Sequence, residues 1–237
     1  MTQRVVVVGN GMVGARFLEE LDAVGADVDV TVLGAEPHAA YNRLLLSDVI
    51  AGRTDLSRLA LPQAPAEARV LLGRAAVALD RGRRVITDDS GAHHEYDVAV
   101  LATGAAAHIP EIAGMSRDGE RARGVRPLRT IDDARGIIAA AGTACRVVVL
   151  GGGVLGVEVA AGLRARGCQV TVVQAAPRLM AAQLDEDAAT ALAGSLAGQG
   201  VDVRLGRGIT SVATDTDDRV RTVVLDDGSR LDADMLV

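Results

Sequence analysis

The chain has 237 residues and a formal charge of −6, with 49% hydrophobic and 24% charged residues. This composition excludes a disordered chain and is typical of one large or two compact globular domains. Apolar runs such as Val5–Val8 have only the length of a strand, so we expect no membrane span, no signal peptide and a cytoplasmic location. The acidity and the low aromatic content, one Phe and two Tyr, argue against nucleic acid as a partner.

Several kinds of chemistry are excluded by the reactive residue types. All 25 basic residues are arginine, so Schiff-base and P-loop chemistry are excluded. Cys145 and Cys168 lie in no metal-binding or redox motif, and we expect both to be small buried residues. The histidines have no metal-like spacing, and the pair His93-His94 is expected in a solvated turn. We therefore expect no metal site.

The first predicted element is a buried strand over Arg4–Val8, which contains four consecutive valines. A glycine-rich turn follows, with the residues Gly9-Asn10-Gly11-Met12-Val13-Gly14. The next segment predicts a helix from Met12 to about Val24, and the β-branched run Val28–Leu33 predicts a second strand. Strand, turn, helix and strand in this order favour parallel pairing through a right-handed crossover.

The same order of elements recurs in the second half of the chain. A strand over Arg146–Leu150 precedes the turn Gly151-Gly152-Gly153-Val154-Leu155-Gly156. A helix from Val154 to about Arg166 follows, and then a strand over Gln169–Val173. The chain therefore consists of two copies of one unit.

Shorter elements complete each copy. The segments Val85–Thr87 and Val220–Leu225 predict short antiparallel strands. The stretch Glu111–Pro127 is rich in Gly, Arg and Asp and predicts a linker between the copies. Thr130 is expected to cap a helix over Asp132–Ala141.

These elements predict an α/β fold with two Rossmann-like, three-layer dinucleotide-binding domains, each with a small inserted antiparallel sheet. We expect the domains to cover residues 1–115 and 116–237. The strand that begins at Tyr96 runs on to Gly104, whereas its counterpart Ala233–Val237 stops midway. We therefore expect a chain truncated at its C-terminus, with a natural end at an edge strand as the alternative.

The two glycine turns are the candidate functional sites. In a G-x-G-x-x-G turn the first glycine makes the bend, the second lets the backbone approach a pyrophosphate, and the third lets the helix pack on the strand. The start of the helix then offers free N–H groups to the phosphates. Each turn has the required strand before it and helix after it, so we expect two dinucleotide sites. Purely structural tight turns are the alternative.

Three polar residues are candidates for further cofactor contacts. Glu36 follows the second strand and can bind a ribose hydroxyl, or it can be an ordinary loop glutamate. Gln174 occupies the corresponding place in the second copy and would not repel a 2′-phosphate, so we expect relaxed selectivity between NADH and NADPH. Glu158 is expected in the first turn of its helix, where it either compensates the helix dipole or faces the redox centre.

The basic residues near Gln174 could strengthen this relaxed selectivity. Arg164, Arg166 and Arg178 are expected to create a positive field there. No general acid–base or nucleophile constellation accompanies the two sites, so we expect no catalytic side chain. This absence suits hydride transfer between two cofactors, which carry the chemistry themselves.

The two glycine units, with Ala102-Thr103-Gly104 between them, resemble the FAD- and NAD(P)H-dependent pyridine nucleotide-disulfide oxidoreductase family over essentially the whole chain. More narrowly, Gly9–Gly14 with Phe17–Leu21, and the stretch Leu179–Asp185, are similar to the N-terminal part of the NAD(P)H-nitrite reductase large subunit. The resemblance implies FAD at the first unit and NAD(P)H at the second. It also places Arg43 and Arg129 close to FAD, the backbone of Ala76 at the adenine, and Glu158 near the nicotinamide.

The expected cofactor residues combine the motifs, the candidate ribose ligands and the residues implied by the resemblance. Those at FAD are Gly9, Asn10, Gly11, Met12, Val13, Gly14, Glu36, Arg43, Ala76, Ala102, Thr103, Gly104 and Arg129. Those at NAD(P)H are Gly151, Gly153, Val154, Leu155, Gly156, Glu158 and Gln174.

Two departures from the family pattern narrow the expected function. The segment Tyr41–Ile50 contains no cysteine pair, which argues against a glutathione- or lipoamide-reductase role. Asp48 follows Leu46-Ser47 where ferredoxin- and rubredoxin-reductase relatives often carry lysine. We expect an electron-entry module of nitrite or nitrate reductase type that passes electrons to a downstream redox centre or partner protein. A ferredoxin- or rubredoxin-type reductase and a non-catalytic nucleotide-binding sensor are the alternatives.

Overall fold

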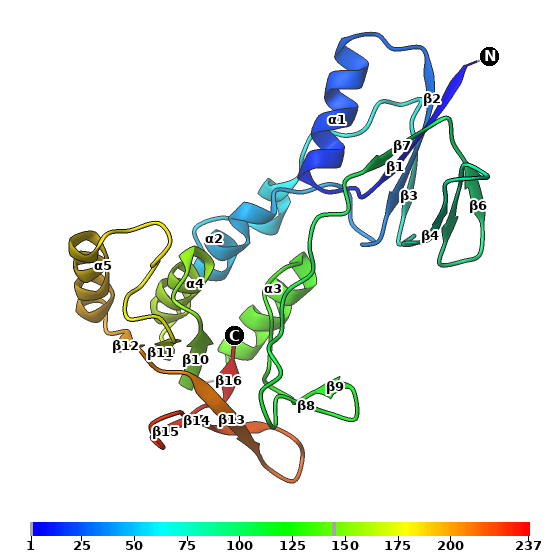
Figure 1. The fold of residues 1–237 in the computed structure, drawn as a ribbon. Helices are drawn as coiled ribbons and strands as arrows, with labels where there is room; N and C mark the ends of the chain where they lie inside the picture. The colour runs from blue at the N-terminus through cyan, green and yellow to red at the C-terminus, as the bar shows by residue number, and fades with distance from the viewer. Residues whose placement is uncertain (1, 144–145) are drawn as a thin grey trace. The chain divides into compact units, whose positions relative to one another are not determined.

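The computed structural model describes residues 2–143 and 146–237, and the chain divides into two compact units (Figure 1). The first unit comprises Met1–Arg43 and Leu56–Ala106, and the second comprises Leu44–Asp55 and Ala107–Val237. Among the described residues, no helix is long and apolar enough to cross a membrane. The domain limits expected from the sequence, 1–115 and 116–237, stay a prediction.

The first unit contains a four-stranded parallel sheet in the order β3-β2-β1-β7. Its strands are β1 (Gln3–Val8), β2 (Val28–Gly34), β3 (Arg69–Leu72) and β7 (Val98–Leu101). The remaining elements are helix α1 (Met12–Ala23), the 3-10 turn η2 (Leu56–Leu59) and the antiparallel strands β4 (Ala76–Asp80), β5 (Val85–Asp88) and β6 (His93–Glu95).

The two faces of this sheet are buried by different elements. On one face Val5 and Val7 of β1 pack with Leu18 of α1. On the other face the alternate residues Val6 and Val8 pack in a cluster that includes Ile86 of β5. Because successive strand residues point to opposite faces, a run of four valines requires cover on both sides. The unit therefore has three layers: helix, parallel sheet and antiparallel sheet.

The second unit contains a four-stranded parallel sheet in the order β12-β11-β10-β16. Its strands are β10 (Arg146–Leu150), β11 (Gln169–Gln174), β12 (Asp202–Leu205) and β16 (Met235–Leu236). Its helices are α2 (Leu46–Ala51), α3 (Ile131–Ala141), α4 (Val154–Ala165) and α5 (Glu186–Gly198), and η1 (Arg43–Leu45) precedes α2. Its antiparallel strands are β8 (Ser116–Arg117), β9 (Glu120–Arg121), β13 (Ile209–Thr214), β14 (Val220–Leu225) and β15 (Arg230–Asp232).

An ion-pair arrangement is repeated in the two units. In the first, the backbone N–H and the guanidinium of Arg4, near the start of β1, donate to Asp97, and the guanidinium also pairs with Glu95. In the second, Arg146 at the start of β10 makes the same contacts with Asp234 and Asp232. This arrangement ties the start of each central strand to the segment before its neighbour, so the repeat extends to side-chain contacts.

These observations confirm an α/β fold with parallel sheets and small antiparallel sheets. The prediction of a linker over Glu111–Pro127 is wrong. Met115, Ala122 and Val125 are buried in the core of the second unit, and Val125 forms a bridge with Leu236. The stretch has no helical or strand period because single apolar residues, separated by turns, enter the core one at a time.

Candidate functional site

The first and third glycines of each turn are required by the fold itself. Gly9 and Gly151 have φ angles of +113° and +108°, a region that disfavours any residue with a side chain. A Cβ atom on Gly14 would lie 2.2 Å from the carbonyl oxygen of Gly9, and one on Gly156 would lie 2.0 Å from that of Gly151. These glycines let each helix start directly against its strand.

The second glycine of each turn is not required by the fold. Gly11 and Gly153 have φ angles of −97° and −77°, which every residue type can adopt. A Cβ on Gly11 would come no closer than 3.8 Å to the end of the Arg43 side chain, and one on Gly153 would meet nothing within 4 Å. Glycine therefore leaves open space at the start of each helix, and a bound pyrophosphate would use this space.

The helix starts at these turns differ from the other long helices in how they are capped. At α3 the Thr130 hydroxyl accepts the N–H of Asp133 at 3.1 Å, and at α5 the Asp185 carboxylate accepts the N–H of Ala188 at 2.8 Å. Both helices also carry two acidic residues in the first turn. Helices α1 and α4 have neither a side-chain cap nor an acid there. Their N–H groups and dipoles are left for an external anion.

Glu158 lies outside the first turn of α4, contrary to the prediction, because it is the fifth residue of the helix. Its carboxylate oxygen Oε2 accepts a hydrogen bond of 2.6 Å from the hydroxyl of Ser47 in α2. Ser47 is only 2% exposed, so the hydroxyl has little access to water. Dipole compensation therefore does not explain Glu158. Ser47 was missed because no known catalytic motif surrounds it.

The two arginines at the end of α4 donate hydrogen bonds to backbone carbonyls of other segments of the second unit. Arg166 donates from Nη2 to the carbonyl oxygen of Val49 at 3.1 Å and from Nε to that of Ile50, both near the end of α2. Arg164 donates to the carbonyls of Cys168 and Gln199. The prediction that these two side chains create a positive field at Gln174 is wrong, because they lie at the opposite end of α4 from the glycine turn.

In the first unit, Glu36 is held by two neighbours. The hydroxyl of Tyr41 donates to Oε2 at 2.6 Å, and Nη2 of Arg43 donates to Oε1 at 2.7 Å. The Arg43 guanidinium also lies 4.8 Å from the centre of the Tyr41 ring. The structure therefore brings together two predicted cofactor residues, Glu36 and Arg43. Tyr41 was missed as the residue that orients both.

Gln174 is not the backbone counterpart of Glu36, although the sequence predicted that the two residues correspond. The N–H of Gly73 donates to the carbonyl of Glu36, and the N–H of Gly206 donates to that of Ala176, both at 3.0 Å. Ala176 therefore occupies the backbone position of Glu36, and Gln174 occupies that of a glycine two residues earlier in the first copy. Neither position in the second copy carries a carboxylate.

The side chain of Gln174 is anchored to the glycine turn. Its Oε1 accepts the N–H of Gly152 at 2.9 Å, so its NH₂ group is the part left to meet a ligand. A Cβ on Gly152 would lie 3.2 Å from the Cβ of Gln174. The first copy has the reverse arrangement, because Asn10 carries the side chain and a Cβ on Gly34 would lie 2.9 Å from it. One side chain thus fills this space in each copy.

The other predicted residues are distributed around the two turns. A Cβ on Gly9 would lie 2.1 Å from the carbonyl oxygen of Ala102, so the segment Ala102–Gly104 adjoins the first turn. Met12, Val13, Val154 and Leu155 begin their helices, and the last three are exposed. Ala76 begins β4. Arg129 precedes α3 in the second unit, where its N–H donates to the Asp133 carboxylate at 3.0 Å.

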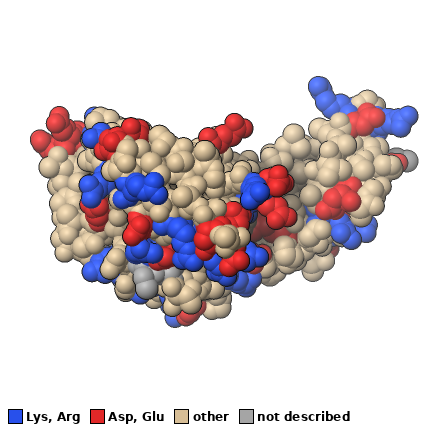
Figure 2. Space-filling model, turned by 90° about the horizontal axis from the view of Figure 1, so that it is seen from below, with Lys and Arg blue, Asp and Glu red and all other residues tan. Residues whose placement is uncertain are grey.

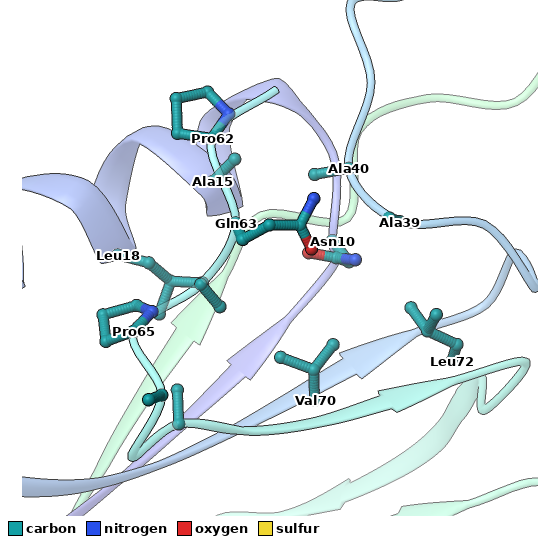
Figure 3. A pocket seen from close by; sticks show the side chains of 13 residues that line it. Asn10, Ala15, Leu18, Ala39, Ala40, Pro62, Gln63, Pro65, Val70 and Leu72 are labelled. Atoms are coloured by element: carbon teal, nitrogen blue, oxygen red, sulfur yellow. The ribbon is translucent and has the colours of Figure 1, made fainter. Parts of the chain in front are cut away.

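A cavity of about 310 Å³ adjoins the first turn on the side of α1 (Figure 3). Leu18 of α1, Val70 of β3 and the segment Pro62–Ala66 line it, and the amides of Asn10 and Gln63 point into it. Asn10 is the one predicted FAD residue among its described lining. The side chain of Asn10 therefore faces this cavity.

Two further predictions concern histidine and cysteine. The prediction of a turn is wrong for the pair, because His93 and His94 both lie in β6. His93 is exposed, whereas Nε2 of His94 is 2.9 Å from the buried carboxylate of Asp88. Cys168 is buried, as predicted. Cys145 lies outside the described residues. No group of three or more potential metal ligands occurs in the part of the chain that the structure describes.

The family model for the pyridine nucleotide-disulphide oxidoreductases matches residues 3–237. The chain belongs to this family. An NAD(P)H nitrite reductase of Bacillus subtilis is 34% identical over 99% of the chain, and the match covers 29% of that protein. The ferredoxin reductase component of a chlorobenzene dioxygenase from Cupriavidus is also 34% identical over 99% of the chain, which covers 56% of that protein. The chain thus spans between 29% and 56% of the length of these two relatives.

Two solved structures share the fold of the chain. The crystal structure of a covalent putidaredoxin reductase–putidaredoxin complex matches 99% of the chain with a TM-score of 0.91 and 29% identity, and the match covers 57% of that chain. A ferredoxin reductase from Rhodopseudomonas palustris matches the whole chain with a TM-score of 0.89 and 28% identity, over 58% of its own length. The chain therefore shares its fold with these two reductase structures.

Proposed function

We propose that the protein is a flavoprotein module that accepts hydride from NAD(P)H and passes electrons to a downstream redox centre. In this proposal both units are Rossmann-like domains, with FAD at the first glycine turn and NAD(P)H at the second. The observation that carries it is the second glycine of each turn. Neither Gly11 nor Gly153 is needed by the fold, and each opens space beside uncapped helix N–H groups.

The residues of the first unit fit FAD. The N–H groups at the start of α1 would hold the pyrophosphate, with Gly9, Gly11 and Gly14 letting the backbone approach it. Glu36 would accept ribose hydroxyls, and Tyr41 and Arg43 fix the orientation of its carboxylate. FAD, when bound, supplies the chemistry of accepting a hydride and releasing single electrons.

The residues of the second unit fit a nicotinamide dinucleotide. The start of α4 would hold the pyrophosphate, and the NH₂ group of Gln174 would face the adenosine end. Glu158 lies one turn further along α4, and its hydrogen bond to Ser47 fixes one carboxylate oxygen. The other oxygen can accept an N–H from the nicotinamide carboxamide.

The identity of the electron acceptor rests on the relatives. The two named relatives that the sequence matches at 34% identity are a nitrite reductase and a ferredoxin reductase component, and a third relative is an assimilatory nitrate reductase electron transfer subunit. The nitrite- or nitrate-reductase assignment is favoured by Asp48. Many ferredoxin reductases carry a lysine at this position, whereas here an aspartate stands there and pairs with Arg53. A cytoplasmic location and a C-terminal truncation stay predictions.

Reconstitution with FAD followed by anaerobic titration with NADH or NADPH tests this function. We expect the protein to retain FAD through gel filtration and its visible flavin band to bleach on addition of the reduced nicotinamide. Gly11→Ala should weaken FAD binding, whereas Gly153→Ala should retain FAD and bleach only at much higher nicotinamide concentration. Gly194→Ala is the matched control, because a Cβ there also meets nothing within 4 Å but the residue lies in the middle of α5.

Two outcomes would contradict the proposal. Protein that binds nicotinamide nucleotides but no flavin would favour a nucleotide sensor. If Gly11→Ala and Gly153→Ala bind both cofactors as the Gly194→Ala control does, the open space at the second glycines has no part in binding.

A further inference from the structure

The second unit contains a pocket of about 660 Å³ at the opposite edge of its sheet from the glycine turn. Asp234, which lines the pocket, donates its N–H to the carbonyl of Arg146, the first residue of β10, whereas Gly151 follows the last residue of that strand. The pocket is therefore separate from the proposed NAD(P)H site. Its charged lining consists of Arg123, Arg126, Arg219, Arg221 and Asp234.

The positive charge of this pocket is largely uncompensated. Arg221 pairs with Asp215 at 2.7 Å, and Asp234 is already engaged by Arg146 at 2.9 Å. Arg123, Arg126 and Arg219 have no carboxylate partner within residues 2–143 and 146–237. On the face drawn in Figure 2, arginine and acidic side chains are interspersed. Three unpaired guanidinium groups around one pocket are unusual in a chain with a net charge of −6.

Arg126 also lines the pocket and carries an unsatisfied donor. Its Nε atom is buried and makes no hydrogen bond among the described residues. A buried donor without a partner is unfavourable, and native proteins rarely leave one unless water or a ligand accepts from it. The side chain lies along α3, since a Cβ on Gly136 would be 2.8 Å from Nη1 of Arg126.

The backbone that carries these arginines is held in place. The N–H of Arg123 donates to the carbonyl of Asp218 at 2.8 Å, and the carbonyl of Arg123 accepts the N–H of Val220 at 2.9 Å. The N–H of Arg126 donates to the carbonyl of Leu236 at 2.8 Å. Between them, a Cβ on Gly124 would lie 2.8 Å from the carbonyl oxygen of Asp234, so the segments touch backbone to backbone. The pocket is thus built on paired strand ends.

We propose that this pocket binds a phosphate ester, with Arg123, Arg126 and Arg219 as the ligands of the phosphate group. A guanidinium presents N–H donors in a planar fork that matches two phosphate oxygens, and three of them offset a dianion. The pocket is much larger than a phosphate ion. Ala139, Ala140 and Val220 form an apolar wall against which the organic part of the ester packs.

Calorimetric titration with inorganic phosphate and with phenyl phosphate tests the proposal. The protein is first saturated with FAD and NAD⁺, which carry no phosphate monoester, so that both glycine turns are occupied, and ionic strength is held constant with NaCl. The pocket variants are Arg123→Gln and Arg219→Gln, both at exposed positions. The matched control is Arg230→Gln, an exposed arginine of the same unit that does not line the pocket.

We expect one phosphate site, tighter binding of phenyl phosphate, and a loss of about tenfold or more in affinity for each pocket variant but not for the control. The proposal is wrong if the protein saturated with FAD and NAD⁺ binds neither probe at millimolar concentration. It is also wrong if the pocket variants bind as tightly as Arg230→Gln. Because the nucleotide sites are filled beforehand, both outcomes are independent of the proposed oxidoreductase function.

Discussion

The glycines of the two turns have different roles in the fold and in binding, and single substitutions to alanine distinguish these roles. Gly14→Ala and Gly156→Ala place a methyl group within about 2.2 Å of a carbonyl oxygen, so each should lower the free energy of unfolding by about 1–3 kcal/mol. Gly194→Ala, in the open middle of α5, should raise it by about 0.5–1 kcal/mol. Urea denaturation of the three variants measures both effects. A neutral Gly156→Ala would show that helix α4 can move away from its strand at little cost.

In the proposed function, Gln174 determines the charge that a bound nicotinamide nucleotide would meet at the end of β11. Gln174→Glu keeps an oxygen for the N–H of Gly152 and adds a negative charge that repels a 2′-phosphate. At an effective dielectric constant of ~20 and with salt screening, this is worth about 1–2 kcal/mol. We therefore expect the ratio of NADPH to NADH dissociation constants to rise about five- to thirtyfold.

Fluorescence titration of both nucleotides at fixed ionic strength gives this ratio. Gln199→Glu, which makes the same charge change at the far end of α5, is the control and should leave the ratio unchanged. If the unmodified protein already prefers NADH by a hundredfold, a residue other than Gln174 sets the selectivity.

At the residue scale, the sequence predicted what a local motif determines. The positions of the glycines and of Thr130 follow from turn and capping rules that act within a few residues, and the structure has them as expected. The partner of Glu158 could not be predicted, because Ser47 is 111 residues away. The same holds for Arg166, whose acceptors lie more than a hundred residues earlier in the chain.

Among the elements, α2 depends on contacts with α4. The Arg166 guanidinium binds the last carbonyls of α2, and a Cβ on Gly162 of α4 would lie 3.1 Å from Ala51. A helix of six residues has little stability of its own, so these contacts hold it. Arg166→Gln should therefore speed amide hydrogen exchange in α2 by about tenfold, with little change in α5.

Hydrogen-exchange mass spectrometry measures this effect. Arg135→Gln serves as the control, because Arg135 pairs with Asp132 of its own helix on the surface of α3. Equal exchange of α2 in the two variants would mean that apolar packing alone holds the helix. Ser47→Ala is the companion variant. It should speed amide exchange in α2 and remove the hydrogen bond to the Glu158 carboxylate, whereas Arg166→Gln should leave the hydrogen bond between Ser47 and Glu158 in place.

Element prediction succeeded where the apolar pattern was long and failed where it was short. The strands of valine and the helices after the glycine turns begin at or within one residue of the predicted positions. The stretch Glu111–Pro127 was predicted as a linker, yet it forms β8 and β9 and sends Met115 and Val125 into the core. Its bridges reach segments about a hundred residues away, which no local window contains.

Across the whole molecule, several carboxylates make the fold sensitive to acid. Hydrogen bonds from Ser90 and His94 lower the pKa of the Asp88 carboxylate. A hydrogen bond from Arg4 lowers the pKa of the Asp97 carboxylate. The pKa of Asp215 is lowered mainly by the backbone N–H of Arg219, and that of Asp227 by Ser229. Each lowered pKa adds stability that is fully present above the unfolded-state value of about 3.9 and is lost as the pH falls through the folded-state value.

We therefore expect the urea midpoint to be steady down to about pH 5 and to fall steeply below about pH 4. Asp97→Asn should lower the midpoint at pH 7 and flatten this fall, because its carboxylate no longer has to be protonated. The exposed Asp55→Asn is the control and should follow the unmodified protein. A fall of equal steepness in Asp97→Asn would place the acid sensitivity elsewhere.

The path of the chain between the two units limits which segments of the gene can be exchanged independently. Because Leu44–Asp55 belongs to the second unit although it lies between β2 and β3 in sequence, the backbone passes from one unit to the other three times. A gene cut after residue 106 would leave the downstream product without α2 and would leave the upstream product with an unsupported insertion. Functional recombinants between family members should therefore take Leu44–Asp55 and α4 from the same parent. These two segments would be inherited together although they are encoded in separate stretches of the gene.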